Sequence, residues 1–120
     1  MTKPHQKLDA WQQAMVLVRM IYAGTAAFPR EEMFGLTSQM RRAAVSIPSN
    51  IAEGAARNGD REYLHFLSIA RGSLSELDTQ LQIAVMLGYL SEGHESLEQA
   101  DRVGQLLSGF SKKISSGMVK

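Results

Sequence analysis

The sequence contains no cysteine, and this absence excludes disulfide bonds, thiolate metal sites and cysteine nucleophiles. Proline occurs only three times, and aromatic residues make up 7% of the chain. No apolar run approaches the roughly 20 residues that a bilayer-spanning helix needs. Thirteen basic and twelve acidic side chains leave a formal net charge of +1, so the overall charge does not point to a nucleic acid or a membrane as a partner.

The composition is that of a globular protein with one core. The chain has 120 residues, enough for one ordinary domain, which we expect over residues 1–120. Hydrophobic residues make up 44% of the chain and charged residues 21%, as is typical of folded domains. The first residues lead into an amphipathic segment that Arg19 interrupts, unlike the apolar centre of a signal peptide. We therefore expect a cytoplasmic protein without a membrane partner.

Apolar residues spaced three and four apart predict helices. Four such segments occur, over residues 7–27, 37–56, 60–88 and 91–115. Asn58-Gly59 and Gly88 mark turns, and the expected N-caps are Thr37, Asp60 and Ser91. Short connections make successive helices antiparallel neighbours, so we expect an all-α, up-down-up-down antiparallel four-helix bundle.

Three of these helices carry apolar stripes that predict their buried faces. The stripe of the first helix is Leu8, Trp11, Met15, Val18, Tyr22 and Thr25. The heptad stripe of the third helix is Tyr63, Leu67, Ala70, Leu74, Leu77, Leu81, Ala84 and Gly88. The stripe of the fourth helix is Ala100, Val103, Leu107, Phe110 and Ile114. We expect the core, rather than base stacking, to use the aromatic residues Trp11, Tyr22, Tyr63, Phe66 and Phe110.

The second helix has a proline in its interior. Pro48 removes one backbone donor and crowds the carbonyl group four residues earlier, which costs about 3 kcal/mol. A kink is therefore expected, tolerated because packing requires it. The same helix is crowded with small residues, which let a neighbouring backbone approach closely; they are Ala43, Ala44, Ser46, Ser49, Ala52 and Ala55.

A cluster of polar residues is expected beside the core, on the second and third helices. Its members are Arg41, Arg42, Asn50, Glu53, Glu76 and Gln80. In one interpretation it is a structural network, in which Glu76 neutralises an arginine and Asn50 satisfies backbone groups that Pro48 leaves free. The alternative is a small ligand-binding, metal-binding or enzymatic site near Arg41, Glu76 and Gln80. We favour the structural network, because no nucleophile or set of metal ligands accompanies the cluster.

One pattern has the spacing of a di-iron ligand pair, namely Glu62-x-x-His65. A complete site of that kind needs a second Glu-x-x-His and two further inward glutamates. Neither His5 nor His94 follows a glutamate at that spacing. Motifs for phosphate loops and serine hydrolases are missing as well. We therefore expect no metal, no cofactor and no enzymatic activity.

The near-zero net charge conceals two ends of opposite sign in the expected bundle. One end gathers seven basic residues, namely Lys3, Lys7, Arg57, Arg61, Lys112, Lys113 and Lys120. With Asp9, Glu53, Asp60 and Glu62 its balance is +3. The other end carries Arg30 and five glutamates, a balance of −4. A basic rim would attract phosphate backbones, although charged helix ends are also ordinary solvated surface.

Two segments carry a resemblance to a known family. Residues 41–54 read Arg-Arg-Ala-Ala-Val-Ser-Ile-Pro-Ser-Asn-Ile-Ala-Glu-Gly, and residues 66–77 read Phe-Leu-Ser-Ile-Ala-Arg-Gly-Ser-Leu-Ser-Glu-Leu. They resemble the four-helix-bundle proteins encoded in intervening sequences of bacterial 23S ribosomal RNA genes, and the resemblance extends over residues 7–114. It implies a cytosolic bundle that assembles into a ring-like homopentamer without enzymatic activity.

The chain is also similar to the accessory protein of diversity-generating retroelements. That protein is a five-fold barrel of bundles that works with a reverse transcriptase and nucleic acid, and it is strongly basic, unlike this chain. The expected partners are therefore further copies of the chain, and RNA or a nucleic-acid-handling protein at the basic rim. Three apolar residues in the first long loop, Met33, Phe34 and Leu36, are the expected contacts within the ring.

Overall fold

The computed structural model describes residues 3–118, so Lys120, one of the basic residues counted above, lies outside the described residues. Within residues 3–118 the chain forms helices and no strand, which confirms the all-α class. The α helices are α1 (Asp9–Thr25), α2 (Leu36–Ala55), α3 (Asp60–Met86) and α4 (Glu95–Met118). Short 3-10 helices are η1 (Pro4–Lys7) before α1 and η2 (Arg30–Glu32) in the α1–α2 loop.

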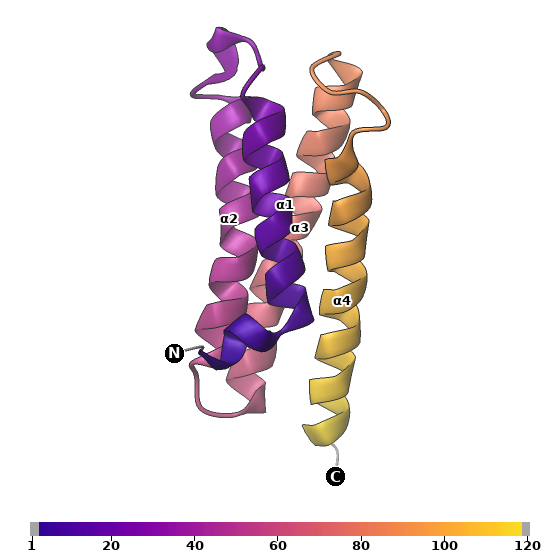
Figure 1. Cartoon of the computed structure of the whole chain (residues 1–120). Coiled ribbons are helices and arrows are strands. Elements are labelled where there is room, and N and C mark those ends of the chain that lie inside the picture. The colour runs from indigo at the N-terminus through magenta and orange to yellow at the C-terminus, as the bar shows by residue number, and fades with distance from the viewer. Residues whose placement is uncertain (1–2, 119–120) are drawn as a thin grey trace.

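The four α helices stand side by side in a bundle that measures 50 × 27 × 20 Å. Each helix packs against its two neighbours in a closed order, α1 on α2, α2 on α3, α3 on α4 and α4 on α1. Successive helices run in opposite directions (Figure 1). The bundle therefore has four sides, which we name by the helices that form them, for example the α1–α2 side.

The two ends of the bundle differ in what they gather. The α1–α2 and α3–α4 loops lie at one end, and η1, the α2–α3 turn and the last turn of α4 lie at the other (Figure 1). Glu32 links the two loops, because its carboxylate accepts hydrogen bonds from the Leu36 backbone N–H at 3.2 Å and from the Tyr89 hydroxyl at 3.1 Å. The first bond satisfies a free donor at the start of α2.

The core contains one apolar stripe from each helix, but the stripe predicted for α1 is only partly buried. The fully buried residues of α1 are Ala10, Ala14, Leu17 and Ile21. Of the predicted stripe, Thr25 is buried, Leu8, Trp11 and Val18 are partly buried against the core, and Met15 and Tyr22 are each 44% exposed. The reason is that α1 carries two apolar stripes, and the one with small alanines lets α2 and α4 approach closely.

The predicted stripes of α3 and α4 are confirmed over most of their length. In α3 the buried residues are Leu67, Ala70, Leu74, Leu77, Gln80, Leu81 and Ala84. In α4 the predicted residues Ala100, Val103 and Leu107 are buried, and Phe110 and Ile114 are partly buried toward the C-terminal end of the helix. Long, regular heptads determine a buried face with little ambiguity.

Helix α3 starts at Asp60 as predicted, and the starts of α1, α2 and α4 differ from the predicted ones by one to four residues. The N-cap positions of α2 and α3 are Gly35 and Gly59, so Thr37 and Asp60 are not N-caps. Helix α4 begins at Glu95 rather than Ser91. There the His94 ring accepts a hydrogen bond from the Ser96 backbone N–H at 3.2 Å, which serves as the cap.

Glycines with positive φ close two of the turns, as the sequence predicts. Gly59 has a φ of 95° and Gly88 a φ of 80°, a region that favours glycine. After α3 the Tyr89 N–H donates to the Ala84 carbonyl and the Gly88 N–H to the Val85 carbonyl. This Schellman arrangement ends α3.

Pro48 lies inside a continuous α2 and is buried. Asn50 was expected to satisfy the backbone groups that Pro48 leaves free, and this expectation was wrong. Its Nδ2 donates to the Ser46 carbonyl at 2.8 Å and not to the Ala44 carbonyl, which has lost its donor to Pro48. The amide of Asn50 therefore reinforces the turn that follows Ser46 in α2.

Candidate interaction surfaces

An apolar strip runs along the α1–α2 side, from the loop at one end toward η1 at the other. Its exposed members are Met15, Tyr22, Met33, Phe34 and Val45. The most exposed is Phe34, at 95%, which projects from the loop after η2. Two shallow hollows, of about 550 and 410 Å³, lie along the strip. The second is lined by Trp11, Met15, Val18, Pro48 and Ala52 among others.

Two of the three predicted loop contacts are available for binding and one is not. Met33 and Phe34 belong to the apolar strip, whereas Leu36 is only 9% exposed. Leu36 is the first residue of α2 and packs into the core of its own chain. Sequence analysis missed the strip on α1, although its second apolar stripe was a usable signal.

Arg41 lies on the α1–α2 side in a fixed position. Its Nε donates to Thr25 Oγ1 at 2.9 Å, and its terminal nitrogen lies 3.4 Å from the Tyr22 carbonyl oxygen. The guanidinium carbon lies 4.6 Å from the centre of the Tyr22 ring, a cation–π contact. Its neighbour Arg42 is exposed and lines a hollow of about 360 Å³ on the α2–α3 side, together with Ser46, Ser73 and Glu76. No carboxylate of residues 3–118 forms an ion pair with either arginine.

The predicted ion pair between Glu76 and an arginine is not formed within the described part of the chain, residues 3–118. Glu76 is exposed on α3, and Arg41 is directed toward α1 instead. An exposed carboxylate keeps its hydration, so it does not need the pairing that a buried one would. Glu53 forms an ion pair with Arg57, at 3.1 Å along α2. Arg41 therefore leaves the cluster for the α1–α2 side, whereas Arg42 and Glu76 remain together at one hollow of the α2–α3 side without an ion pair.

The other polar residues of the predicted cluster lie on the α2–α3 side. The hydroxyl groups of Ser46 and Ser73 lie 2.8 Å apart, and Asn50 Nδ2 lies 3.0 Å from Ser46 Oγ. Gln80 is buried; its Nε2 lies 3.5 Å from Glu76 Oε2, and its Oε1 has no hydrogen-bond partner among residues 3–118. Ile69, two turns before Glu76 on the same face of α3, is 39% exposed.

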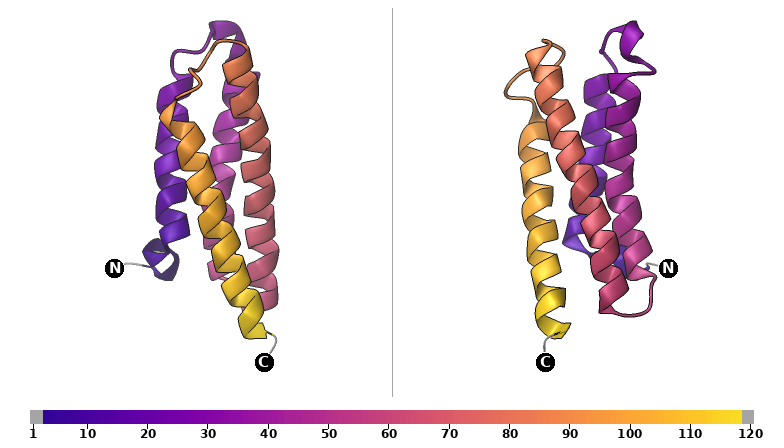
Figure 2. Two further views of the ribbon diagram at one scale, coloured as in Figure 1. Left: turned by 90° about the vertical axis from the view of Figure 1, so that its right-hand side faces the viewer. Right: turned by 180° about the vertical axis from the view of Figure 1, so that it is seen from behind.

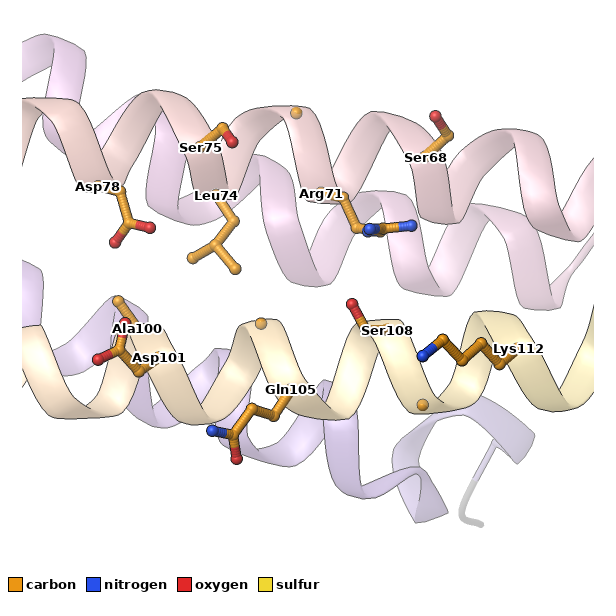
Figure 3. A pocket seen from close by; sticks show the side chains of 13 residues that line it. Ser68, Arg71, Leu74, Ser75, Asp78, Ala100, Asp101, Gln105, Ser108 and Lys112 are labelled. Atoms are coloured by element: carbon orange, nitrogen blue, oxygen red, sulfur yellow. The ribbon is translucent and has the colours of Figure 1, made fainter.

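A groove of about 820 Å³ separates α3 from α4 (Figure 3). The two helices lie close together beside their connecting loop and diverge toward the other end (Figure 2). Small residues line the groove, including Gly72, Ser75 and Gly104. Asp78 and Asp101 face each other across it. Partial burial raises the pKa of Asp78, and the nearby charge of Asp101 raises that pKa further.

The structure places the six described basic residues of the predicted rim at one end of the bundle or near it. Lys3 and Lys7 flank η1, Arg57 and Arg61 flank the α2–α3 turn, and Lys112 and Lys113 lie on α4 toward its C-terminus. They are exposed. Arg57 is partly engaged, since it pairs with Glu53 and its guanidinium carbon lies 5.0 Å from the centre of the Phe66 ring.

The Glu62 and His65 pair does not extend to a metal centre in the described chain. Both side chains are exposed near the start of α3. Residues 3–118 contain no group of three or more histidines or carboxylates placed to hold a metal ion. None of the helices in this part of the chain combines the length and hydropathy of a membrane-crossing segment.

The fold and surfaces define a class: an antiparallel four-helix bundle with an apolar side and a basic end. The family model of the 23S rRNA-intervening sequence protein matches residues 6–109. The chain therefore belongs to the 23S rRNA-intervening sequence protein family, which confirms the resemblance found in the sequence.

A solved structure shares the fold. It is the crystal structure of a protein with unknown function from the S23 ribosomal protein family of Bacteroides thetaiotaomicron. The two chains are 18% identical and superpose with a TM-score of 0.64, over 89% of this chain and 95% of the other. No curated protein matches the chain in sequence.

Proposed function

We propose that this chain is a non-catalytic interaction protein that assembles with copies of itself into a ring, a homopentamer, and presents a basic rim to RNA. The apolar strip of the α1–α2 side carries the proposal. Its members Phe34, Met33 and Tyr22 are 95%, 55% and 44% exposed. Contiguous exposed apolar side chains of this kind typically mark a surface that another protein covers.

A further copy is the favoured occupant of the strip, because the chain belongs to a family for which the sequence resemblance implies a homopentamer. The alternative, a ligand or catalytic site near Arg41, Glu76 and Gln80, has less support. Arg41 contacts Thr25 and Tyr22, whereas Glu76 and Gln80 lie together on α3. These side chains do not converge on one cavity.

Self-assembly is tested by sedimentation equilibrium at micromolar concentration. We expect the mass of wild-type protein to be a multiple of the 13.2 kDa chain mass. Phe34→Glu should yield single chains with an unchanged far-UV spectrum, because a charge replaces the most exposed member of the strip. Met86→Glu is the matched control, since Met86 is 75% exposed but lies outside the strip. A wild-type protein that sediments as a single chain would overturn the proposal.

The second half of the proposal, RNA contact, is supported by the basic residues that η1, the α2–α3 turn and α4 bring to one end. Parallel copies in a ring would repeat this charge around a rim. We expect ribosomal RNA fragments to be retained in filter binding at low salt and released as salt rises. Reversing Lys112 and Lys113 should weaken retention, and reversing Arg19 and Arg30 should not.

The outcomes of this RNA assay are distinct. Failure to retain any fragment at low salt would contradict RNA contact while leaving self-assembly standing. A nucleic-acid-handling protein is the remaining candidate for the rim in that case. Native mass measurement of the purified protein, with any co-purifying nucleic acid identified, tests both halves on one sample.

A further inference from the structure

We infer that the copies meet by two different sides, the α2–α3 side of one copy against the α1–α2 side of the next, with Glu76 of one copy accepting hydrogen bonds from Arg41 of its neighbour. This inference rests on the proposed self-assembly and specifies its contact. Within residues 3–118 neither Arg41 nor Glu76 belongs to an ion pair. They lie on adjacent sides of the bundle and have opposite charges, so a copy beside this one can pair them.

The heights of the two residues along the bundle agree. The contact between the Ser46 and Ser73 hydroxyls, at 2.8 Å, marks one level on α2 and α3. Glu76 lies three residues beyond Ser73, about 4.5 Å, and Arg41 five residues before Ser46, about 7.5 Å, at 1.5 Å per residue. Because α2 and α3 are antiparallel, both displacements run toward the same end. The difference of about 3 Å is within reach of an arginine side chain.

The same alignment places an exposed apolar side chain against the apolar strip. Ile69, which is 39% exposed, lies four residues before Ser73, about 6 Å toward the basic end. On α2 that height falls between Pro48 and Ala52, both of which line the second hollow of the apolar strip, of about 410 Å³. If neighbouring copies are parallel and not shifted along the bundle axis, Ile69 of one copy meets the hollow of the next. In the same arrangement Glu76 meets Arg41.

A contact between two adjacent sides also produces a closed ring. The α1–α2 and α2–α3 sides share α2 (Figure 1) and are roughly at right angles in a bundle of four helices. When the two contacting sides face directions about 90° apart, repeating the contact closes a ring of about four copies. When they face directions about 108° apart, the ring closes at five copies. In such a ring α2 faces the axis, and every basic end points in one direction.

Charge exchange tests the pairing. In sedimentation equilibrium, Glu76→Arg and Arg41→Glu should each raise the concentration needed for half-assembly by about ten-fold or more, because each places like charges together. The double variant Arg41→Glu/Glu76→Arg should recover most of the loss. Thermal unfolding followed by circular dichroism verifies that each variant folds, since Arg41→Glu also removes the hydrogen bond to Thr25.

A matched control separates this contact from others. Asp78→Arg makes the same charge change on the opposite flank of α3, in the α3–α4 groove, and should leave assembly unchanged. Dissociation by Asp78→Arg, or wild-type assembly of both single variants, would overturn the inference while self-assembly itself stands. A wild-type protein that is monomeric would instead refute the proposed function.

Cross-linking provides a measurement that does not depend on Arg41. The chain has no cysteine, so Ser49→Cys and Ile69→Cys chains introduce single thiols at similar heights on the two sides. When one of the chains carries a mass tag and the two are mixed and oxidised, the expected product is the mixed Ser49→Cys–Ile69→Cys dimer. Cross-linking only between identical chains would show a two-fold contact and would contradict the inference.

Discussion

The hydroxyl groups of Ser46 on α2 and Ser73 on α3 lie 2.8 Å apart, and this contact sets the register of the two helices. Asn50 adds a second bond to the same Ser46 oxygen at 3.0 Å. The three polar side chains thus form a small network at the edge of an otherwise apolar interface. Such a network is satisfied only in one alignment of α2 against α3.

The first prediction concerns this network. Ser46→Ala and Ser73→Ala should each lower the free energy of unfolding by about 1 kcal/mol, because each removes one partner of a partly buried hydrogen bond. The double variant should lose clearly less than the sum of the two, since the same bond is removed twice. Urea denaturation at one fixed protein concentration measures all three values. Strictly additive losses would show that the two hydroxyls do not interact.

The second prediction concerns the close approach of α2 and α3 at Gly54. A Cβ atom there would lie 2.9 Å from Tyr63 Cδ1 and 3.0 Å from Phe66 Cβ. Gly54→Ala should therefore lower the free energy of unfolding by about 1–3 kcal/mol, the range for overpacked sites. Gly72→Ala is the control, because Gly72 is helical with open space around it. It should raise stability by about 0.5–1 kcal/mol. Equal effects of the two substitutions in thermal melts would contradict this assignment.

The third prediction concerns the start of α4. His94 Nδ1 accepts from the Ser96 backbone N–H at 3.2 Å and lies 2.7 Å from Ser96 Oγ. His94→Ala should cost about 1 kcal/mol, as the loss of a cap usually does. His94→Asn should retain most of that stability, because its side-chain oxygen can accept the same hydrogen bond. If alanine and asparagine gave the same melting temperature, the capping role would be wrong.

The fourth prediction concerns pH and Asp78. Its pKa is raised above the ordinary value by burial and by Asp101, so the folded state binds a proton at Asp78 more tightly than the unfolded chain does. Above the raised pKa, the ionised Asp78 therefore lowers the stability of the folded state. This loss disappears as the pH falls from the raised pKa to the ordinary value. Asp78→Asn should raise the melting temperature at pH 7.

Melting curves between about pH 4 and pH 7 measure this contribution. The gain of Asp78→Asn over wild type should shrink as the pH is lowered, because the wild-type carboxyl becomes neutral. Asp101→Asn should reduce the same pH dependence, since it removes the neighbouring charge. Parallel curves for wild type and Asp78→Asn would show that Asp78 titrates normally.

The sequence predicts the helices well because their periodicity is local, but it does not determine which stripe of α1 is buried. Trp11, Met15 and Tyr22 repeat at helical spacing just as Ala14 and Leu17 do. The larger residues suggested the core. The structure buries the smaller ones instead, because small side chains allow two neighbouring helices to approach. Only packing against α2 and α4 distinguishes these two stripes.

The sequence likewise does not determine which partners the residues of the polar cluster contact. Arg41 and Glu76 are correctly assigned to neighbouring helices, and the sequence suggests an ion pair between Glu76 and an arginine. The side-chain direction of Arg41 depends on Thr25 and Tyr22 of a third helix, which no pattern within α2 reveals. The distribution of basic residues between the two ends, by contrast, follows from helix order alone and is predictable.

The arrangement of the chain ends matters for anyone who labels or immobilises this protein. Because η1, the α2–α3 turn and the last turn of α4 all lie at one end of the bundle (Figure 1), an affinity tag at either terminus would shield the lysines there and dampen any signal from an added polynucleotide. Gly93, which is exposed in the opposite loop with open space around it, is a better attachment point for a dye or a surface linker.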